Sequence, residues 1–305
     1  MTTPDQQSHN EAKGGYDTTN KAKKLCLCIL LGMIAAGCAQ VRSGTPNAPA
    51  ASADTKIQNT NNLNNYMVAV AWKQNAAEYN ALYYQGFNIA KMHVEEALKN
   101  HKDTDKPLAI VTDFDDTLAT PLEYWGYLIE QGNEAFDDEI WDAWIPENKM
   151  TPTAGAKEFL DFCQDNHVEV FYVTSRDQGE KTYEYALNNI KALSFPYADK
   201  EHLFVLMDTS NKEEIQNKIA ETHHIIVKLG DNLNDFSRRY YVSDVDERNR
   251  LMTQGKDLYG VTYVLFPNPT DGHWIKSIFG ESEPADTAEN REIWKQAATK
   301  HKWKK

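Results

Sequence analysis

Hydrophobic positions between residues 108 and 266 fall into short runs that are separated by segments with helical periodicity. The runs are rich in β-branched and aromatic residues and occupy 108–113, 168–174, 203–206, 224–229 and 261–266. Helices are expected between them, over about 179–192 and from about residue 211. Because buried strands that alternate with helices form βαβ units, the pattern predicts an α/β fold with a parallel sheet and flanking helices.

Two further segments extend this sheet. Apolar residues recur at helical spacing over 65–100, which predicts an N-terminal segment of one or two helices packed on the core. The first two strands are separated by roughly 50 residues rich in Trp and Tyr, more than a crossover needs. We expect about 119–150 to form a small cap over the strand ends and 151–164 to return as a helix.

The first 37 residues have the pattern of an export signal. Three lysines precede a 12-residue apolar run over 25–36, which is too short to span a bilayer. The run ends in the sequence AAGC, which resembles the lipobox of bacterial lipoproteins and implies a signal peptide over 1–37 and a lipid on Cys38. An uncleaved signal anchor is the alternative. In such lipoproteins the residues after the Cys guide sorting, and Gln40 rather than Asp favours the outer membrane.

Composition and charge narrow the class of protein. Residues 38–65 are rich in Ser, Thr, Asn, Pro and Ala without periodicity, which predicts a flexible tether before a domain over 66–305. After processing only Cys163 would remain unmodified, so no disulfide can form within one chain. The whole chain carries a formal charge of −13, and residues 38–305 about −14. This charge argues against nucleic acid as a partner. The sequence leaves a homodimer open.

Acidic clusters follow two of the predicted strands. The first is DFDDT at 113–117, and the second is GDNLND at 230–235. Ligands bind at the carboxyl edge of open α/β sheets, so the two clusters should meet there. Carboxylates this close repel one another unless a hard cation lies among them, and oxygen ligands suit Mg²⁺. Helix N-caps or turns are the alternative for either cluster alone. Together the clusters predict metal-assisted phosphate chemistry.

The spacing within the first cluster assigns roles to its carboxylates. Asp113 and Asp115 are two residues apart, so strand alternation sends both toward the same side. Two carboxylates at one centre can act as nucleophile and general acid. Attack on a phosphate meets a repulsion of about 4 kcal/mol per charge pair at 4 Å. Mg²⁺ on Asp113 would cancel it, with Asp231 as the other carboxylate ligand and Asp235 acting through water.

Both clusters resemble motifs of a known superfamily. DxDxT after one strand and GDNxxDF at 230–236 after another are similar to motifs of the haloacid dehalogenase superfamily, in a spelling closest to the class C nonspecific acid phosphatases, the bacterial lipoprotein e group. The resemblance runs from about residue 65 to about 280 and implies a Rossmann-like, haloacid dehalogenase-like fold. It also implies that Asp113 forms an aspartyl-phosphate and that Asp115 protonates the leaving oxygen. Mg²⁺ would bind the side chain of Asp231 and the backbone carbonyl of Asp115.

Two more positions match this family by the order of motifs. Thr174 would donate a hydrogen bond to the phosphate, and Lys212 would offset charge on the transferring phosphoryl group. Taken alone, each is more often structural. Arg176 is a candidate second cation at the phosphate, with a surface ion pair as the alternative.

The chain also departs from the family pattern. Glu and Asn are usual where this chain has Asp116 and Pro121, a Lys is usual near Thr209, and an aromatic residue near Asp271. The family clamps an aromatic base between two rings. Trp141 matches one side of this clamp, with a place in the core as its alternative, and Asp271 replaces the other side. His273 and Trp274 are candidates to compensate.

The sequence therefore predicts a lipid-anchored, Mg²⁺-dependent acid phosphatase in the bacterial cell envelope. Its expected substrates are small phosphomonoesters, nucleoside 5′-monophosphates or nicotinamide mononucleotide. The alternatives are a surface binding lipoprotein that keeps the scaffold without turnover, and a phosphotransferase that uses an acceptor other than water.

Overall fold

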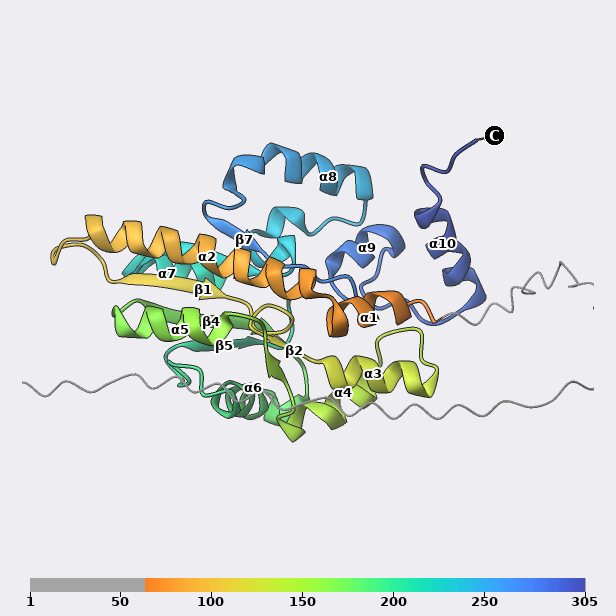
Figure 1. Ribbon diagram of the computed structural model, residues 1–305, viewed down its shortest axis with the longest axis horizontal. Coiled ribbons are helices and arrows are strands. Elements are labelled where there is room, and N and C mark those ends of the chain that lie inside the picture. Colours follow the sequence, from red (N-terminus) through yellow and green to blue (C-terminus); the bar gives the residue numbers. More distant parts are fainter. Residues whose placement is uncertain (1–63, 305) are drawn as a thin grey trace, which may run out of the picture. The chain divides into compact units, whose positions relative to one another are not determined.

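The computed structural model describes residues 64–304 (Figure 1). The predicted signal peptide, the lipidation residue Cys38 and nearly all of the predicted tether lie outside this range. The strands are β1 (Leu108–Thr112), β2 (Ala119–Thr120), β3 (Thr151–Pro152), β4 (Glu169–Ser175), β5 (Leu203–Leu206), β6 (His224–Gly230) and β7 (Tyr263–Leu265). The α-helices are α1 (Met67–Asn75), α2 (Ala77–Asn100), α3 (Leu122–Gln131), α4 (Asp138–Trp144), α5 (Ala156–Asp165), α6 (Thr182–Ala192), α7 (Glu213–Thr222), α8 (Val245–Gln254), α9 (His273–Phe279) and α10 (Ala288–Ala298).

Five parallel strands form the central sheet, in the order β5-β4-β1-β6-β7. Every residue of β1 is buried, as expected for a strand covered by helices on both faces. The predicted α/β fold with a parallel sheet is confirmed. The chain leaves β1 for β4 on one side and reaches β6 on the other, so the carboxyl end of β1 lies at the point where ligands bind in such sheets.

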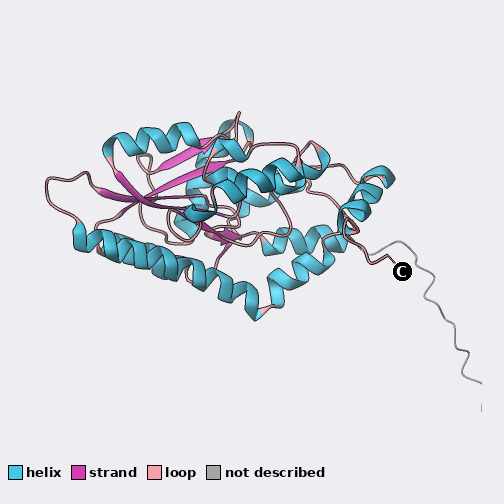
Figure 2. Ribbon diagram, turned by 90° about the horizontal axis from the view of Figure 1, so that it is seen from above, coloured by secondary structure: helices cyan, strands magenta, loops and turns pink. Residues whose placement is uncertain are grey.

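Successive residues of a strand point to opposite faces of the sheet, and each face is covered by its own hydrophobic core. Ile110 and Tyr172 face the larger core, which includes side chains of α2, α5 and α6. Val111 and Phe171 face the smaller one, which includes Ile219 of α7. Figure 2 shows the strands in the interior with helices on both sides. The period of two along each strand thus sorts side chains between the layers.

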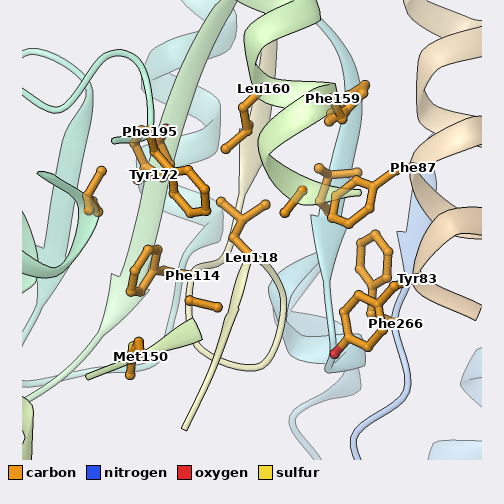
Figure 3. Close-up of a cluster of buried hydrophobic side chains, with 14 of the residues drawn as sticks. Tyr83, Phe87, Phe114, Leu118, Met150, Phe159, Leu160, Tyr172, Phe195 and Phe266 are labelled. Atoms are coloured by element: carbon orange, nitrogen blue, oxygen red, sulfur yellow. The ribbon is translucent and has the colours of Figure 1, made fainter. Parts of the chain in front are cut away.

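The N-terminal segment consists of two helices that meet at Ala76, whose backbone is extended. The prediction of one or two helices over 65–100 thus resolves to two. Helix α2 lies lengthwise over the sheet (Figure 1) and contacts β6 and β7. Its Phe87 packs on Phe159 of α5 and on Phe266, which follows β7 (Figure 3). A Cβ on Gly86 would lie 2.4 Å from the Phe266 ring, so glycine permits this close approach.

The segment between β1 and β4 contains α3 and α4, and its two short strands β2 and β3 pair antiparallel. The return helix is shorter than predicted, because residues 151–152 pair with β2 and Gly155, at φ +88°, precedes α5. The fifth strand is also shorter, at three residues. Between residues 64 and 304, none of the helices is both long enough and apolar enough to cross a bilayer.

Candidate active site

Carboxylates from two strand ends meet at the carboxyl edge of the sheet. Asp113 directly follows β1, Asp231 directly follows β6, and Asp235 ends a short 3₁₀ helix over Leu233–Asp235. Oxygen atoms of these three side chains lie within 4.8 Å of one another. They line a cavity of about 510 Å³, whose wall also includes Thr174 and Lys212. The structure therefore brings both acidic clusters together, at the edge where the sequence placed them.

Asp113 lines this cavity and is 7% exposed. Its Oδ1 accepts a short hydrogen bond from Lys212 Nζ, and its Oδ2 accepts one of 3.1 Å from Thr117. Burial raises the pKa of Asp113 to about 7, with Lys212 opposing the shift and Asp235 and Asp115 adding to it. Lys212 also donates to Asp235 at 2.7 Å. Burial would lower the pKa of Lys212, but the two carboxylates together raise it above its ordinary value.

The second cluster is held by its own backbone. Asp235 Oδ2 accepts from the backbone N–H of Asn232 at 2.8 Å, and the Asn232 side chain accepts from the Asp235 backbone in a capping box. A Cβ on Gly230 would lie 2.5 Å from the Asp235 carboxylate, so only glycine lets that side chain fold back over the strand end. This close approach explains the glycine that opens the GDNxxD sequence.

Among residues 64–304, no lysine or arginine forms an ion pair with Asp231. Thr117 lies 3.3 Å from its Oδ1, and Asn268 Nδ2 donates to its Oδ2 at 2.8 Å, so both contacts are neutral. Burial raises the pKa of Asp231 well above its ordinary value, and Asp235, Asp113 and Asp116 raise it further.

Arg176 binds a carboxylate rather than lying free beside the cavity. Its Nε donates to Asp115 Oδ2 at 2.8 Å and its Nη2 to Oδ1 at 2.6 Å, which is a bidentate pair. Thr174 donates to the same Oδ2 at 3.2 Å. The remaining guanidinium nitrogen, Nη1, donates to Asn189 at 2.7 Å. The surface ion pair considered for Arg176 is wrong in one respect, because its side chain is buried.

The cavity wall also contains aromatic side chains and further acidic ones. Phe136 and Trp141 line it, and Trp141, 9% exposed, also packs against Tyr124 and Trp144. Trp141 is thus both a core residue and part of the cavity wall. Asp271 lines the cavity, and burial raises its pKa to about 6. Burial lowers the pKa of His273, another lining residue, to about 4.

Trp274, by contrast, packs against Trp294 and lines a different, apolar cavity. It therefore does not replace the missing ring. Pro121 and Thr209, two of the departures from the family pattern, do line the acidic cavity.

The donor set fits a hard divalent cation. The clustered ligand atoms are carboxylate oxygens, which Mg²⁺ prefers. The five carboxylates of the two acidic clusters lie beside three cations, Lys73, Lys212 and Arg176, so these eight groups carry a formal charge of −2; the five are Asp113, Asp115, Asp116, Asp231 and Asp235. Asp113 and Asp231 present oxygens that could bind the ion directly. Asp235 also presents its oxygens to the cluster, and they accept hydrogen bonds from Lys212 and from the backbone N–H of Asn232.

The fold and this carboxylate site define an α/β phosphatase. The family model of the haloacid dehalogenase superfamily, subfamily IIIB (acid phosphatase), matches residues 31–274. The chain belongs to this family and is a phosphomonoesterase, which confirms the resemblance seen in its motifs.

Two solved structures of the class C acid phosphatase from Bacillus anthracis, one with tungstate bound, are similar to this chain. Each is 28% identical in sequence, with a TM-score of 0.69 over 78% of this chain and 96% of that one.

Sequence reasoning missed three residues of this site. Asn268 follows β7, and the rule that polar residues at strand ends face the ligand could have identified it. Thr117 is the threonine of the DxDxT motif, and the motif alone does not indicate its contacts with Asp113 and Asp231. Lys73 lies on α1, three residues after the buried Val70, so its only signal was a lysine on a buried helical face.

Proposed function

We propose that this phosphatase is Mg²⁺-dependent and works through an aspartyl-phosphate on Asp113. The observation that carries the proposal is the unequal pairing of the carboxylates. Asp113, Asp115, Asp116 and Asp235 each contact a lysine or arginine, whereas Asp231 contacts none among residues 64–304. A buried carboxylate without a cation is costly, and a bound metal ion relieves that cost.

Asp113 and Asp231 would hold the ion with their side chains, and the resemblance adds the backbone carbonyl of Asp115. When bound, Mg²⁺ would offset the electrostatic repulsion between the Asp113 carboxylate and the phosphate of the substrate. The protein itself supplies a preorganised cation in Lys212, which contacts Asp113 directly. Such a fixed ammonium group stabilises charge on the transferring phosphoryl group without reorganisation.

The reaction divides into two displacements at phosphorus. In the first, an oxygen of Asp113 bonds to phosphorus, the bond to the leaving oxygen breaks, and Asp115 gives that oxygen a proton. In the second, Asp115 takes a proton from water, whose oxygen attacks phosphorus and releases Asp113 and inorganic phosphate. Arg176 and Thr174 donate three hydrogen bonds to the two oxygens of Asp115, which fix its position, and its carboxyl group must take up the proton that it gives before the first displacement.

The residues that line the cavity favour a substrate whose leaving group contains a ring and carries no negative charge. Phe136 and Trp141 offer aromatic surface, and the cavity volume lies in the range of small-molecule sites. Its two cations, Arg176 and Lys212, are already paired with carboxylates. We therefore propose nucleoside 5′-monophosphates or nicotinamide mononucleotide as substrates. One of the similar Bacillus anthracis structures has tungstate bound, and because tungstate is an oxyanion this supports an oxyanion site in this chain too.

We further propose that a lipid on Cys38 anchors the enzyme in the bacterial cell envelope, at the outer membrane. The support is the sequence alone, since the lipobox-like AAGC follows a short apolar run. A single acyl chain binds membranes only marginally, so firm anchoring needs the several chains that bacterial lipoproteins carry.

The test is a panel of phosphomonoesters with the detergent-solubilised full chain, with and without Mg²⁺. Nucleoside monophosphates should be hydrolysed faster than diphosphates, and chelation should abolish turnover. Asp113→Asn should fold normally and be inactive, because the amide keeps the shape and loses the nucleophile. Normal turnover in Asp113→Asn would refute the covalent mechanism. Product analysis with an added alcohol separates hydrolysis from phosphotransfer.

A further inference from the structure

Lys73, from the N-terminal helix that precedes the first strand of the sheet, reaches the catalytic centre. Lys73 lies on α1, and its side chain is fully buried, at 0% exposure. Its ammonium group donates to Asp116 Oδ1 at 2.7 Å and to Thr270 Oγ1 at 2.9 Å. Burying an ammonium group is costly unless it is paired, so this contact is a built feature of the fold rather than a surface ion pair.

Its partner Asp116 lies in the loop that carries Asp113 and Asp115, and its backbone has φ +54°. Residues other than glycine seldom adopt this region, and they do so where the surroundings hold them there. The surroundings of Asp116 are hydrogen bonds to both its side chain and its backbone. The Asp116 carboxylate accepts hydrogen bonds from Lys73, Thr120 and Asn268. Its backbone carbonyl accepts one from Tyr83, and its N–H donates to the carbonyl of Ala119.

The direction of each hydrogen bond in this network follows from the donors available. An ammonium group has no acceptor, so Thr270 Oγ1 must accept from Lys73 and give its own proton elsewhere. That proton goes to Asn268 Oδ1, 2.9 Å away, which also accepts from the backbone N–H groups of Thr270 at 3.1 Å and Asp271 at 3.2 Å. With Oδ1 committed, the Asn268 amide must turn Nδ2 toward Asp231, at 2.8 Å, and Asp116, at 3.2 Å.

We propose that Lys73 is a positioning residue of the phosphatase reaction, which pairs with Asp116 and, through Thr270, orients Asn268 against Asp231. Lys73 contacts neither Asp113 nor Asp231 directly, so its effect is relayed. The relay leaves one oxygen of Asp231 bound by an amide and the other near only a threonine hydroxyl. The part of the inference that concerns Asp231 rests on the proposed metal site.

Two substitutions separate the charge from the relay. Lys73→Met keeps the buried stem and removes the ammonium group. Thr270→Val keeps the ion pair and the side-chain shape but removes the hydroxyl that links Lys73 to Asn268. Thr270→Ser keeps that hydroxyl. Lys157→Met is the control, because Lys157 also pairs with an aspartate, Asp161, but on the partly exposed surface of α5.

We expect Lys73→Met and Thr270→Val to lower kcat about 10- to 100-fold in full-length protein that unfolds cooperatively, as for other residues that orient metal ligands. KM should change less than about threefold, and Lys157→Met should match the wild type. Calorimetric titration with Mg²⁺ alone should show roughly tenfold weaker binding to Thr270→Val, largely recovered in Thr270→Ser.

Three outcomes would overturn the inference: a folded Thr270→Val enzyme with kcat within twofold of wild type, equal losses in Thr270→Ser and Thr270→Val, or equal losses in Lys73→Met and Lys157→Met. Thr270→Val removes no charge, so it decides the question even where Lys73→Met fails to fold. If the wild type binds no Mg²⁺, the proposed metal site fails, while the kinetic comparison still judges the role of Lys73.

Discussion

Asp271 should make the stability of the protein depend on pH in a predictable direction. Burial is the largest cause that raises its pKa from an ordinary 3.8 to about 6, and repulsion from Asp116 and Asp115 adds to it. The N–H of Gly272, at 2.6 Å, and the charge of Lys73 oppose the shift. One pKa unit corresponds to about 1.4 kcal/mol, so the ionised side chain costs at most about 3 kcal/mol.

The sign follows from proton binding. Between about pH 4 and pH 6 the folded protein holds a proton on Asp271 that the unfolded chain has released, so stability falls as pH rises through this window. Asp271→Asn keeps an oxygen for the Gly272 N–H and cannot ionise. Near pH 4 its free energy of unfolding should be close to that of wild type, and at pH 8 it should be higher by up to about 3 kcal/mol.

Urea unfolding at several pH values, in buffer with a metal chelator, measures this difference. The control is Asp257→Asn, which removes a carboxylate that is 90% exposed and should change stability by no more than about 0.5 kcal/mol at any pH. A difference between Asp271→Asn and wild type that stays constant from pH 4 to pH 8 would refute the reasoning.

Four other substitutions probe the rest of the site and the anchor. Asp231→Asn should weaken Mg²⁺ binding at least about tenfold, with partial rescue by excess metal, and activity that ignores metal would contradict the assignment. Arg176→Lys cannot keep the bidentate pair with Asp115, and losing a charge-assisted hydrogen bond of roughly 1.5–3 kcal/mol should lower kcat about tenfold or more. Trp141→Leu should raise KM for a nucleoside monophosphate about tenfold and leave a small alkyl phosphate unaffected, because only the former has a ring to stack; equal losses would show that Trp141 acts only as a core residue. Cys38→Ser should yield unprocessed or soluble protein, and wild-type protein that leaves membranes without detergent would rule out the lipid anchor.

The sheet and the carboxylates at its edge could be predicted because both depend on local rules. A buried apolar run that is followed at once by Asp113 or Asp231 predicts a strand with a carboxylate at the carboxyl edge of the sheet. The start of α5 was predicted too early. Residues 151–152 pair with β2 and the left-handed Gly155 precedes the helix, and Pro152 and Gly155 are local signals that a helix does not run through 151–155.

The partners of the charged residues could not be predicted in the same way. The sequence places Arg176 near a strand end, but its pairing with Asp115 depends on side-chain geometry that the sequence does not specify. Lys73 precedes the first strand by 35 residues, and its contact with Asp116 exists only because α1 packs beside the strand ends. Such a pairing is set by the assembled fold, and no spacing rule reports it.

The two departures from the family pattern that carry charge, Asp116 and Asp271, are physically connected. Asn268 Nδ2 donates to Asp116, and its Oδ1 accepts from the backbone N–H of Asp271 at 3.2 Å. Each carboxylate also raises the cost of ionising buried acids nearby, since Asp116 raises the pKa of both Asp271 and Asp231. The Asn268 amide therefore links the backbone of Asp271 to Asp116 and to the proposed metal ligand Asp231. Because residues that share a partner are rarely additive, a change at Asp271 should alter the effect of a change at Asp116, which makes these two positions one feature of this enzyme rather than two.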